Sequence, residues 1–249
     1  MANDPSGSQN LQIKPVWDST TRWFHWINVM CIIGLVGVGV VILNNKVLGV
    51  SADGKVLLKT VHVYIGYVFT ANLVWRLFWA FKGNKFARWK SFLPLGRGYR
   101  DALRQYVDGS RSGNPPQYLG HNPVAKLMVT LLFLLLTVQA VSGLVLAGTD
   151  LYFPPFGAEI EQWVDATPDD GVALKPGSKE GTDPQAYADM REFRSPFMAA
   201  HYYTFYIMLF AVLVHIASIV MTEIREKNGL VSAMFTGSKV ISKKALDED

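Results

Sequence analysis

Four long apolar stretches restrict what this chain can fold into. They cover residues 23–43, 56–81, 124–147 and 197–222. A helix needs roughly 20 apolar residues to cross a hydrocarbon core of about 30 Å, and each stretch is at least that long. The sequence therefore predicts an all-α integral membrane protein, a bundle of four spanning helices.

Composition supports the membrane class and limits the cofactors. Half of the 249 residues are hydrophobic, and the mean hydropathy is +0.17, which is too apolar for an ordinary soluble domain. Residues 1–10 lack the pattern of a cleaved signal peptide, so the first span is expected to stay as an anchor. Cys31 is the only cysteine, which excludes an intramolecular disulfide, a thiolate metal cluster and the Cys-x-x-Cys-His attachment of a c-type haem. Any haem here is expected to be b-type.

The connections between the spans differ in charge. The one between the second and third spans carries eight basic and two acidic residues, and the one between the third and fourth carries ten acidic and four basic residues. The positive-inside rule places the basic connection in the cytoplasm and the acidic one outside. Four spans then put both termini in the cytoplasm. The net charge of +4 follows from this topology, so no nucleic-acid partner is expected.

Four of the five histidines fall inside the apolar stretches: His25, His62, His201 and His215. Ionisable groups at this depth are costly and usually functional. The predicted topology places His25 and His215 toward the cytoplasm and His62 and His201 toward the outside. His201 and His215 are 14 residues apart, roughly 21 Å along one helix and about 40° from alignment. One helix thus offers a ligand at each depth.

Pairing by depth gives two candidate haem sites. His25 and His215 would bind the iron of a cytoplasmic-side haem, and His62 and His201 the iron of an outer-side haem. Two imidazoles fill both axial positions and favour electron transfer over oxygen binding. Each histidine alone also has a simpler interpretation: His25 as an interfacial belt residue, and the others as hydrogen-bonding residues between helices.

Two arginines are candidate partners for haem propionates, Arg22 one turn before His25 and Arg76 near the inner end of the second span. The alternative is that both are ordinary positive-inside anchors. His121 precedes a helix that Asn122 caps and Pro123 begins, and we interpret it as structural rather than as a ligand.

These residues resemble a known family. Arg22 to Trp26, His62 with Gly66 and Tyr67, the turn over residues 120–123, and His201 with His215 are similar to bacterial cytochrome b561 and to the b-type cytochrome subunit of membrane nickel-iron hydrogenases. The resemblance implies a core with two haem b groups, the four histidines as axial ligands, and electron exchange with quinone.

The expected layout is a disordered cytoplasmic N-terminus over residues 1–16, a diheme transmembrane domain over 17–225 and a cytoplasmic tail over 226–249. Within the domain, residues 148–196 form a periplasmic loop, with short helices expected at 158–164 and 185–193. This loop is either a docking surface or a solubilising cap.

The leading functional hypothesis is an electron-transfer subunit of the bacterial inner membrane, linking the quinone pool to a periplasmic partner such as a multihaem c-type cytochrome or a hydrogenase-like module. Quinone oxidoreductase activity and a homo-oligomer are compatible with it. One alternative is a stand-alone oxidoreductase acting on superoxide or ferric ions, which the acidic outer loop disfavours for superoxide. The other is a non-redox metal transporter, disfavoured because the histidines divide between two depths.

Overall fold

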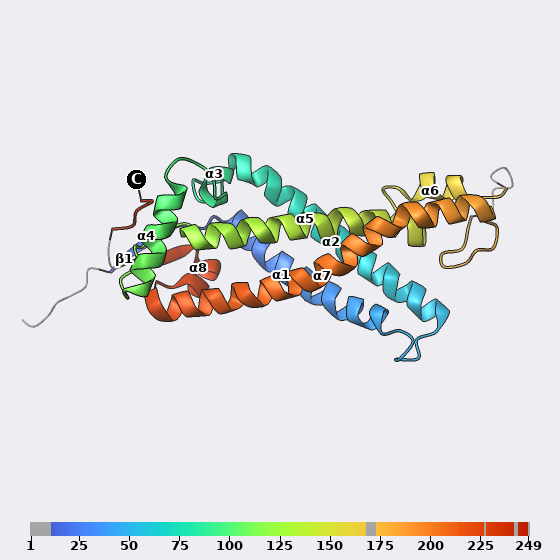
Figure 1. The fold of residues 1–249 in the computed structure, drawn as a ribbon, viewed down its shortest axis with the longest axis horizontal. Coiled ribbons are helices and arrows are strands. Elements are labelled where there is room, and N and C mark those ends of the chain that lie inside the picture. The colour runs from blue at the N-terminus through green and yellow to red at the C-terminus, as the bar shows by residue number, and fades with distance from the viewer. Residues whose placement is uncertain (1–10, 168–172, 227, 242–243, 249) are drawn as a thin grey trace, which may run out of the picture. The chain divides into compact units, whose positions relative to one another are not determined.

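The computed structural model describes residues 11–167, 173–226, 228–241 and 244–248, and Figure 1 shows its elements. Four long helices contain the apolar stretches: α1 (Ser19–Leu43), α2 (Ala52–Lys82), α5 (Pro123–Leu151) and α7 (Pro184–Glu226). Each is long and apolar enough to cross a membrane. The prediction of an all-α membrane fold with four spanning helices is therefore confirmed.

Each long helix begins after a residue whose side-chain oxygen accepts a hydrogen bond from the backbone amide three positions later. The four capping residues are Asp18, Ser51, Asn122 and Asp183, with N–O distances of 2.7, 3.1, 2.8 and 2.8 Å. Such caps satisfy amides that have no partner within the first turn. The cap predicted at Asn122, followed by Pro123 in the first helical position, is confirmed.

The long helices expose large apolar side chains along much of their length. Examples are Met30 on α1, Phe78 on α2, Leu134 on α5 and Phe210 on α7, each more than 60% exposed. Exposed apolar surface on this scale marks contact with another apolar phase or partner. For helices of this length, the hydrocarbon core of a bilayer is that phase.

The chain divides into two compact units. Unit 1 contains residues 1–25, 75–133 and 210–249, and unit 2 contains residues 26–74 and 134–209. Each of the four long helices contributes residues to both units. The two predicted histidine pairs separate along the same division, since His25 and His215 belong to unit 1 and His62 and His201 to unit 2.

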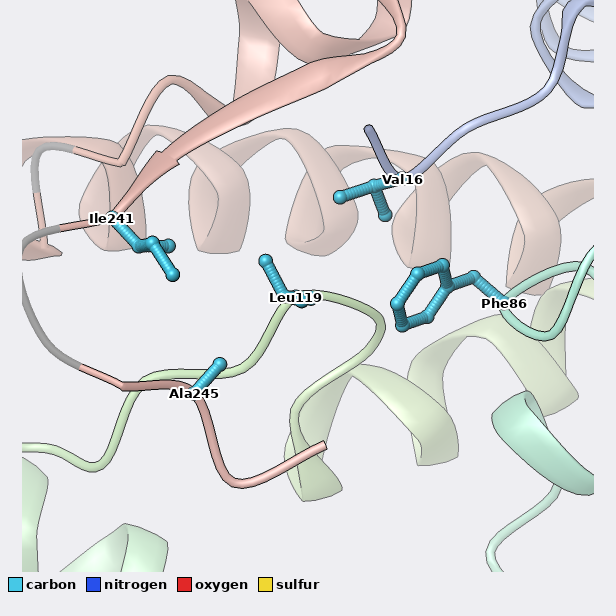
Figure 2. Packing of buried hydrophobic residues seen from close by; sticks show 5 residues of the cluster. All are labelled: Val16, Phe86, Leu119, Ile241 and Ala245. Carbon is cyan, nitrogen blue, oxygen red and sulfur yellow. The ribbon is translucent and has the colours of Figure 1, made fainter. Parts of the chain in front are cut away.

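Unit 1 contains a small sheet made from the two ends of the chain. Strand β1 (Gln12–Pro15) pairs antiparallel with β2 (Ser238–Ile241), and Ile13 lies opposite Val240. A short helix, α8 (Leu230–Thr236), precedes β2. Beside the sheet, five buried side chains point toward one another in Figure 2: Val16, Phe86, Leu119, Ile241 and Ala245.

The N-terminal segment expected to be disordered over residues 1–16 contains β1, and the tail expected over residues 226–249 contains α8 and β2. Val16 and Ile241 are almost fully buried, so ordering these segments removes apolar surface from water. The Asp247 carboxylate also accepts hydrogen bonds from the backbone amides of Leu119 and Gly120, at 2.7 and 2.8 Å. Residues 1–10, 227, 242–243 and 249 lie outside the described part of the chain.

The described parts of the connections contain three further helices: α3 (Trp89–Phe92), α4 (Tyr99–Arg111) and α6 (Gly157–Val164). Helix α6 confirms the short helix expected at 158–164. The segment 185–193 is helical too, but it is the first part of α7, which continues through Pro196. Membrane helices tolerate proline because neighbouring groups can satisfy the carbonyl that it leaves without a donor.

Candidate functional site

Unit 2 contains a cavity between its helices where two histidines face each other. His62 comes from α2 and His201 from α7, and their ring centroids lie 6.3 Å apart with an angle of 70° between the ring planes. Both line a cavity of about 240 Å³ whose walls are mainly apolar. The structure therefore brings together the pair that was predicted for the outer side.

The tautomer of His201 follows from its hydrogen bonds. Its Nδ1 atom lies 3.0 Å from the Ser142 hydroxyl, and that hydroxyl donates its own proton to the Val138 carbonyl at 2.6 Å. The ring also hydrogen-bonds the backbone carbonyl of Gln139. A Ser142 hydroxyl that gives its proton to Val138 can only accept from Nδ1, so these contacts favour the tautomer with the proton on Nδ1 and a free lone pair on Nε2.

Two glycines leave room beside the imidazoles. A Cβ atom added at Gly39 would lie 3.4 Å from Cε1 of His62, and one added at Gly143 would lie 3.4 Å from Cε1 of His201. Both glycines line the cavity, so longer side chains there would fill the space around the rings. The sequence interpretation had selected Gly66, which also lines the cavity, and missed these two. Their place within long apolar helices was the available signal.

Unit 1 contains the second pair. His25 on α1 and His215 on α7 belong to this unit and are close enough to interact electrostatically. Ala211, one turn before His215, is buried. Both histidines are half-buried, so this pair too combines imidazoles from two long helices.

Arg76 lies in the same unit and is only 3% exposed. Its guanidinium carbon is 5.8 Å from the ring centroid of Phe24, 5.3 Å from that of Phe92 and 5.5 Å from that of Phe133. Asp18 adds a favourable electrostatic interaction. Within the described residues, its buried Nη1 atom has no hydrogen-bond partner. A buried guanidinium that lies over aromatic rings and has a donor atom without a hydrogen-bond partner can bind an anion in addition.

Arg22, the other predicted propionate partner, makes different contacts. Its guanidinium donates to the backbone carbonyl of Phe235 and, at 3.2 Å, to the Ser19 hydroxyl. These bonds tie the start of α1 to α8. They leave Arg76 as the better placed of the two arginines for an anion.

His121 packs against Trp17, with ring centroids 4.9 Å apart. Burial lowers the pKa of His121 to about 3, together with the nearby positive charges of Lys239 and Arg76. The ring is therefore neutral at physiological pH. This environment agrees with the structural role that the sequence suggested.

No group of three or more histidine, cysteine, aspartate or glutamate side chains suited to a metal ion occurs within the described ranges. The histidines occur as two separate pairs. This arrangement gives the metal-transporter hypothesis no positive support.

Comparison with known proteins identifies similar chains. Residues 16–237 match the family described as prokaryotic cytochrome b561. The chain is 25% identical over 258 residues to a probable Ni/Fe-hydrogenase B-type cytochrome subunit of Rhizobium leguminosarum bv. viciae, covering 96% of this chain and 95% of the relative. A probable subunit of the same kind from Bradyrhizobium diazoefficiens is 26% identical, with 96% and 92% covered.

A shorter match links the chain to the probable Ni/Fe-hydrogenase 1 B-type cytochrome subunit of Escherichia coli K12. The two are 28% identical over 149 residues, which cover 56% of this chain and 62% of that subunit, less than two thirds of its length. No solved structure matches the chain.

Proposed function

This chain belongs to the prokaryotic cytochrome b561 family, and on that premise we propose that it is a membrane cytochrome with two haem b groups that transfers electrons between the quinone pool and a periplasmic redox partner. The observation that carries the proposal is the division of the four intramembrane histidines into two pairs, one in each compact unit.

The geometry of the unit 2 pair fits two axial ligands of one iron. An imidazole nitrogen binds a first-row metal ion at about 2 Å, so two rings on opposite sides of one ion have centroids roughly 6 Å apart. The 6.3 Å between His62 and His201 agrees with this separation. Both rings line the cavity, and the contact of Nδ1 of His201 with Ser142 leaves Nε2 for a ligand. The residues present therefore fit a haem.

His25 and His215 would hold the second haem, with Arg76 beside it as the partner of a propionate. A haem supplies a one-electron redox centre when bound. With two imidazoles to hold each iron, a haem bound at either site would offer no open position to oxygen, which would favour outer-sphere electron transfer. The long helices hold the ligands in place, and their apolar side chains keep water from the sites.

The names of the relatives suggest the partner. Because several are named as Ni/Fe-hydrogenase B-type cytochrome subunits, we infer that a hydrogenase-like module is the first candidate and a multihaem c-type cytochrome the second. The segment between α5 and α7 is acidic and carries α6. We expect the partner to dock there.

The proposed location is the bacterial inner membrane, with both termini in the cytoplasm. Between α2 and α5, the basic residues Arg88, Lys90, Arg97, Arg100, Arg104 and Arg111 are all exposed. Such a concentration of positive charge close to spanning helices is typical of the cytoplasmic side.

The haem content of the detergent-purified protein tests the proposal. We expect the pyridine haemochrome assay to give two non-covalent b haems per chain, and we expect added quinol to reduce them. Protein that is folded but contains no haem would disprove the cytochrome assignment for this chain. One haem per chain would disprove the two-site arrangement.

A further inference from the structure

Unit 2 contains a partly buried ion cluster that the haem ligands do not account for, in which the side chain of Lys59 is 27% exposed. Asp150 on α5 accepts contacts from two cations: Lys59 Nζ on α2 at 2.5 Å from Oδ2, and Arg194 Nη2 on α7 at 2.8 Å from Oδ1. The side chain of Arg194 is 9% exposed and that of Asp150 is 16% exposed. Three long helices thus meet at one carboxylate.

Helical spacing places this cluster on the faces that carry the histidines. Lys59 is three residues before His62 on α2, and Arg194 is seven residues before His201 on α7. Residues three, four or seven positions apart share one face of a helix. Lys59 and Asp150 line the same cavity as the two histidines. Arg194 does not line the cavity itself and joins this site through its ion pair with Asp150.

The charges of the cluster do not balance. Two cations share one carboxylate, and both oxygens of Asp150 are already occupied. Within the described residues, the buried Nε atom of Arg194 has no hydrogen-bond partner. Because an uncompensated buried charge is costly, this arrangement calls for one more anion at the cavity.

We propose that Lys59 and Arg194 bind a propionate carboxylate of the haem held by His62 and His201, with Asp150 orienting both cations. This inference rests on the proposed function. Lysine and arginine form strong charge-assisted hydrogen bonds with carboxylates, so one propionate would complete the charge balance. Lys59 and Arg194 are positioning residues, and their positive charge favours the reduced iron, which carries one positive charge fewer.

Redox titration of the two-haem protein tests this role with two substitutions, one that removes a positive charge and one that removes a negative charge. We expect Lys59→Met to lower the midpoint potential of the haem held by His62 and His201, and Asp150→Asn to raise it. Each shift should correspond to about a tenfold change in the reduction equilibrium, or 59 mV for one electron. The other haem keeps its potential. Lys59→Arg retains the charge and is expected to restore the wild-type value.

The matched control is Lys55→Met, one turn before Lys59 on the same helix. Lys55 does not line the cavity, so its substitution is expected to leave both potentials unchanged. If Lys59→Met does not fold, Lys59→Gln and Asp150→Asn carry the same test. A cluster that only ties the helices together would lower stability or haem content without potential shifts of opposite sign.

Infrared difference spectra distinguish propionate contact from a distant charge effect. With haem labelled by carbon-13 at its carboxylates, we expect the label-sensitive bands of the wild type to shift in Lys59→Met and not in Lys55→Met. Two haems per chain with unchanged bands and potentials in Lys59→Met would overturn this inference alone. Wild-type protein without a haem at the His62 and His201 pair would instead overturn the proposed function.

Discussion

The buried and partly buried cations of the two units have different partners. In unit 2, Lys59 and Arg194 are ion-paired with the Asp150 carboxylate. In unit 1, the guanidinium of Arg76 lies on three phenyl rings, and Lys239 donates to the carbonyls of Tyr118 and Gly120, at 3.4 and 3.1 Å.

Within the described residues, neither Arg76 nor Lys239 has a carboxylate within ion-pair distance. Similar pairs of histidines are thus set in different electrostatic surroundings. We expect the two haem sites to differ in potential for this reason.

Removing one ligand from each unit gives the largest expected effect. We expect His215→Ala to lose the haem of unit 1 and to keep that of unit 2, and His62→Ala to do the reverse. The measurement is haem per chain together with the dithionite-reduced spectrum, in which each variant should retain about half of the wild-type absorbance. Retention of both haems in His215→Ala would contradict the assigned pairing.

Raising the pH should relieve the buried charge of Lys239. Burial lowers the pKa of this amine to about 8, although Asp247, Glu226 and Glu223 act in the opposite direction. Between pH 8 and 10.5 the unfolded chain keeps a proton that the folded chain has lost, so this group makes stability rise with pH there. The total is on the order of 3 kcal/mol.

A Lys239→Met variant lacks this contribution and serves as the reference. Tyrosines also titrate in this pH range, but they are common to both proteins. Between pH 8 and 10.5, the apparent melting temperature of the wild type should therefore rise relative to that of the variant. A constant difference would show that Lys239 keeps its proton.

Loss of the Arg76 charge should have a smaller effect that is confined to unit 1. Two unit charges separated by roughly 10 Å interact by about 1–2 kcal/mol at an effective dielectric constant near 20. We expect Arg76→Met to lower the potential of the haem at His25 and His215, as followed by redox titration. Arg22→Met is the comparison variant, because Arg22 already bonds Phe235 and Ser19. Equal shifts in both variants would argue against a special role for Arg76.

The smallest effect is expected at Ser142, whose hydroxyl contacts Nδ1 of His201. Ser142→Ala removes one acceptor from the Nδ1 proton and weakens the basicity of the ligand. The potential of the unit 2 haem should rise slightly, while the unit 1 haem stays unchanged. Cys31→Ala, on a different helix of unit 2, provides a control for a small buried change. A fall in potential would contradict the tautomer deduced for His201.

The sequence predicted the long helices and both histidine pairs because these depend on local signals. Apolar length defines a spanning helix, and an ionisable residue inside one is conspicuous. The cap at Asn122 was visible for the same reason. The sequence placed the fourth spanning helix only at its apolar stretch, residues 197–222, and expected a separate short helix at 185–193, whereas α7 runs continuously from Pro184 to Glu226. Met190 is buried against Ile160, Val164 and Leu174, and this packing supports the helix before Pro196.

Other features depend on contacts between distant parts of the chain. The partner of Gln12 in the sheet is Ile241, and a strand of four residues carries too little pattern to indicate such a partner. The ion cluster joins Lys59, Asp150 and Arg194 from three helices. The sequence analysis had counted Asp150 and Arg194 only as determinants of topology and had not considered Lys59. The spaces at Gly39 and Gly143 require knowledge of which helix faces which histidine.

The pairing of β1 with β2 has a consequence for how the chain is inserted. Two strands from opposite ends of the chain can pair only if both ends are on the same face of the bilayer, which requires an even number of crossings. All four spanning helices are synthesised between them, so the sheet closes after the last helix has entered the membrane. A chain that skipped one helix would leave its ends on opposite faces, where Val16 and Ile241 could not share a core. The sheet can therefore form only when the helices between β1 and β2 have crossed the membrane an even number of times.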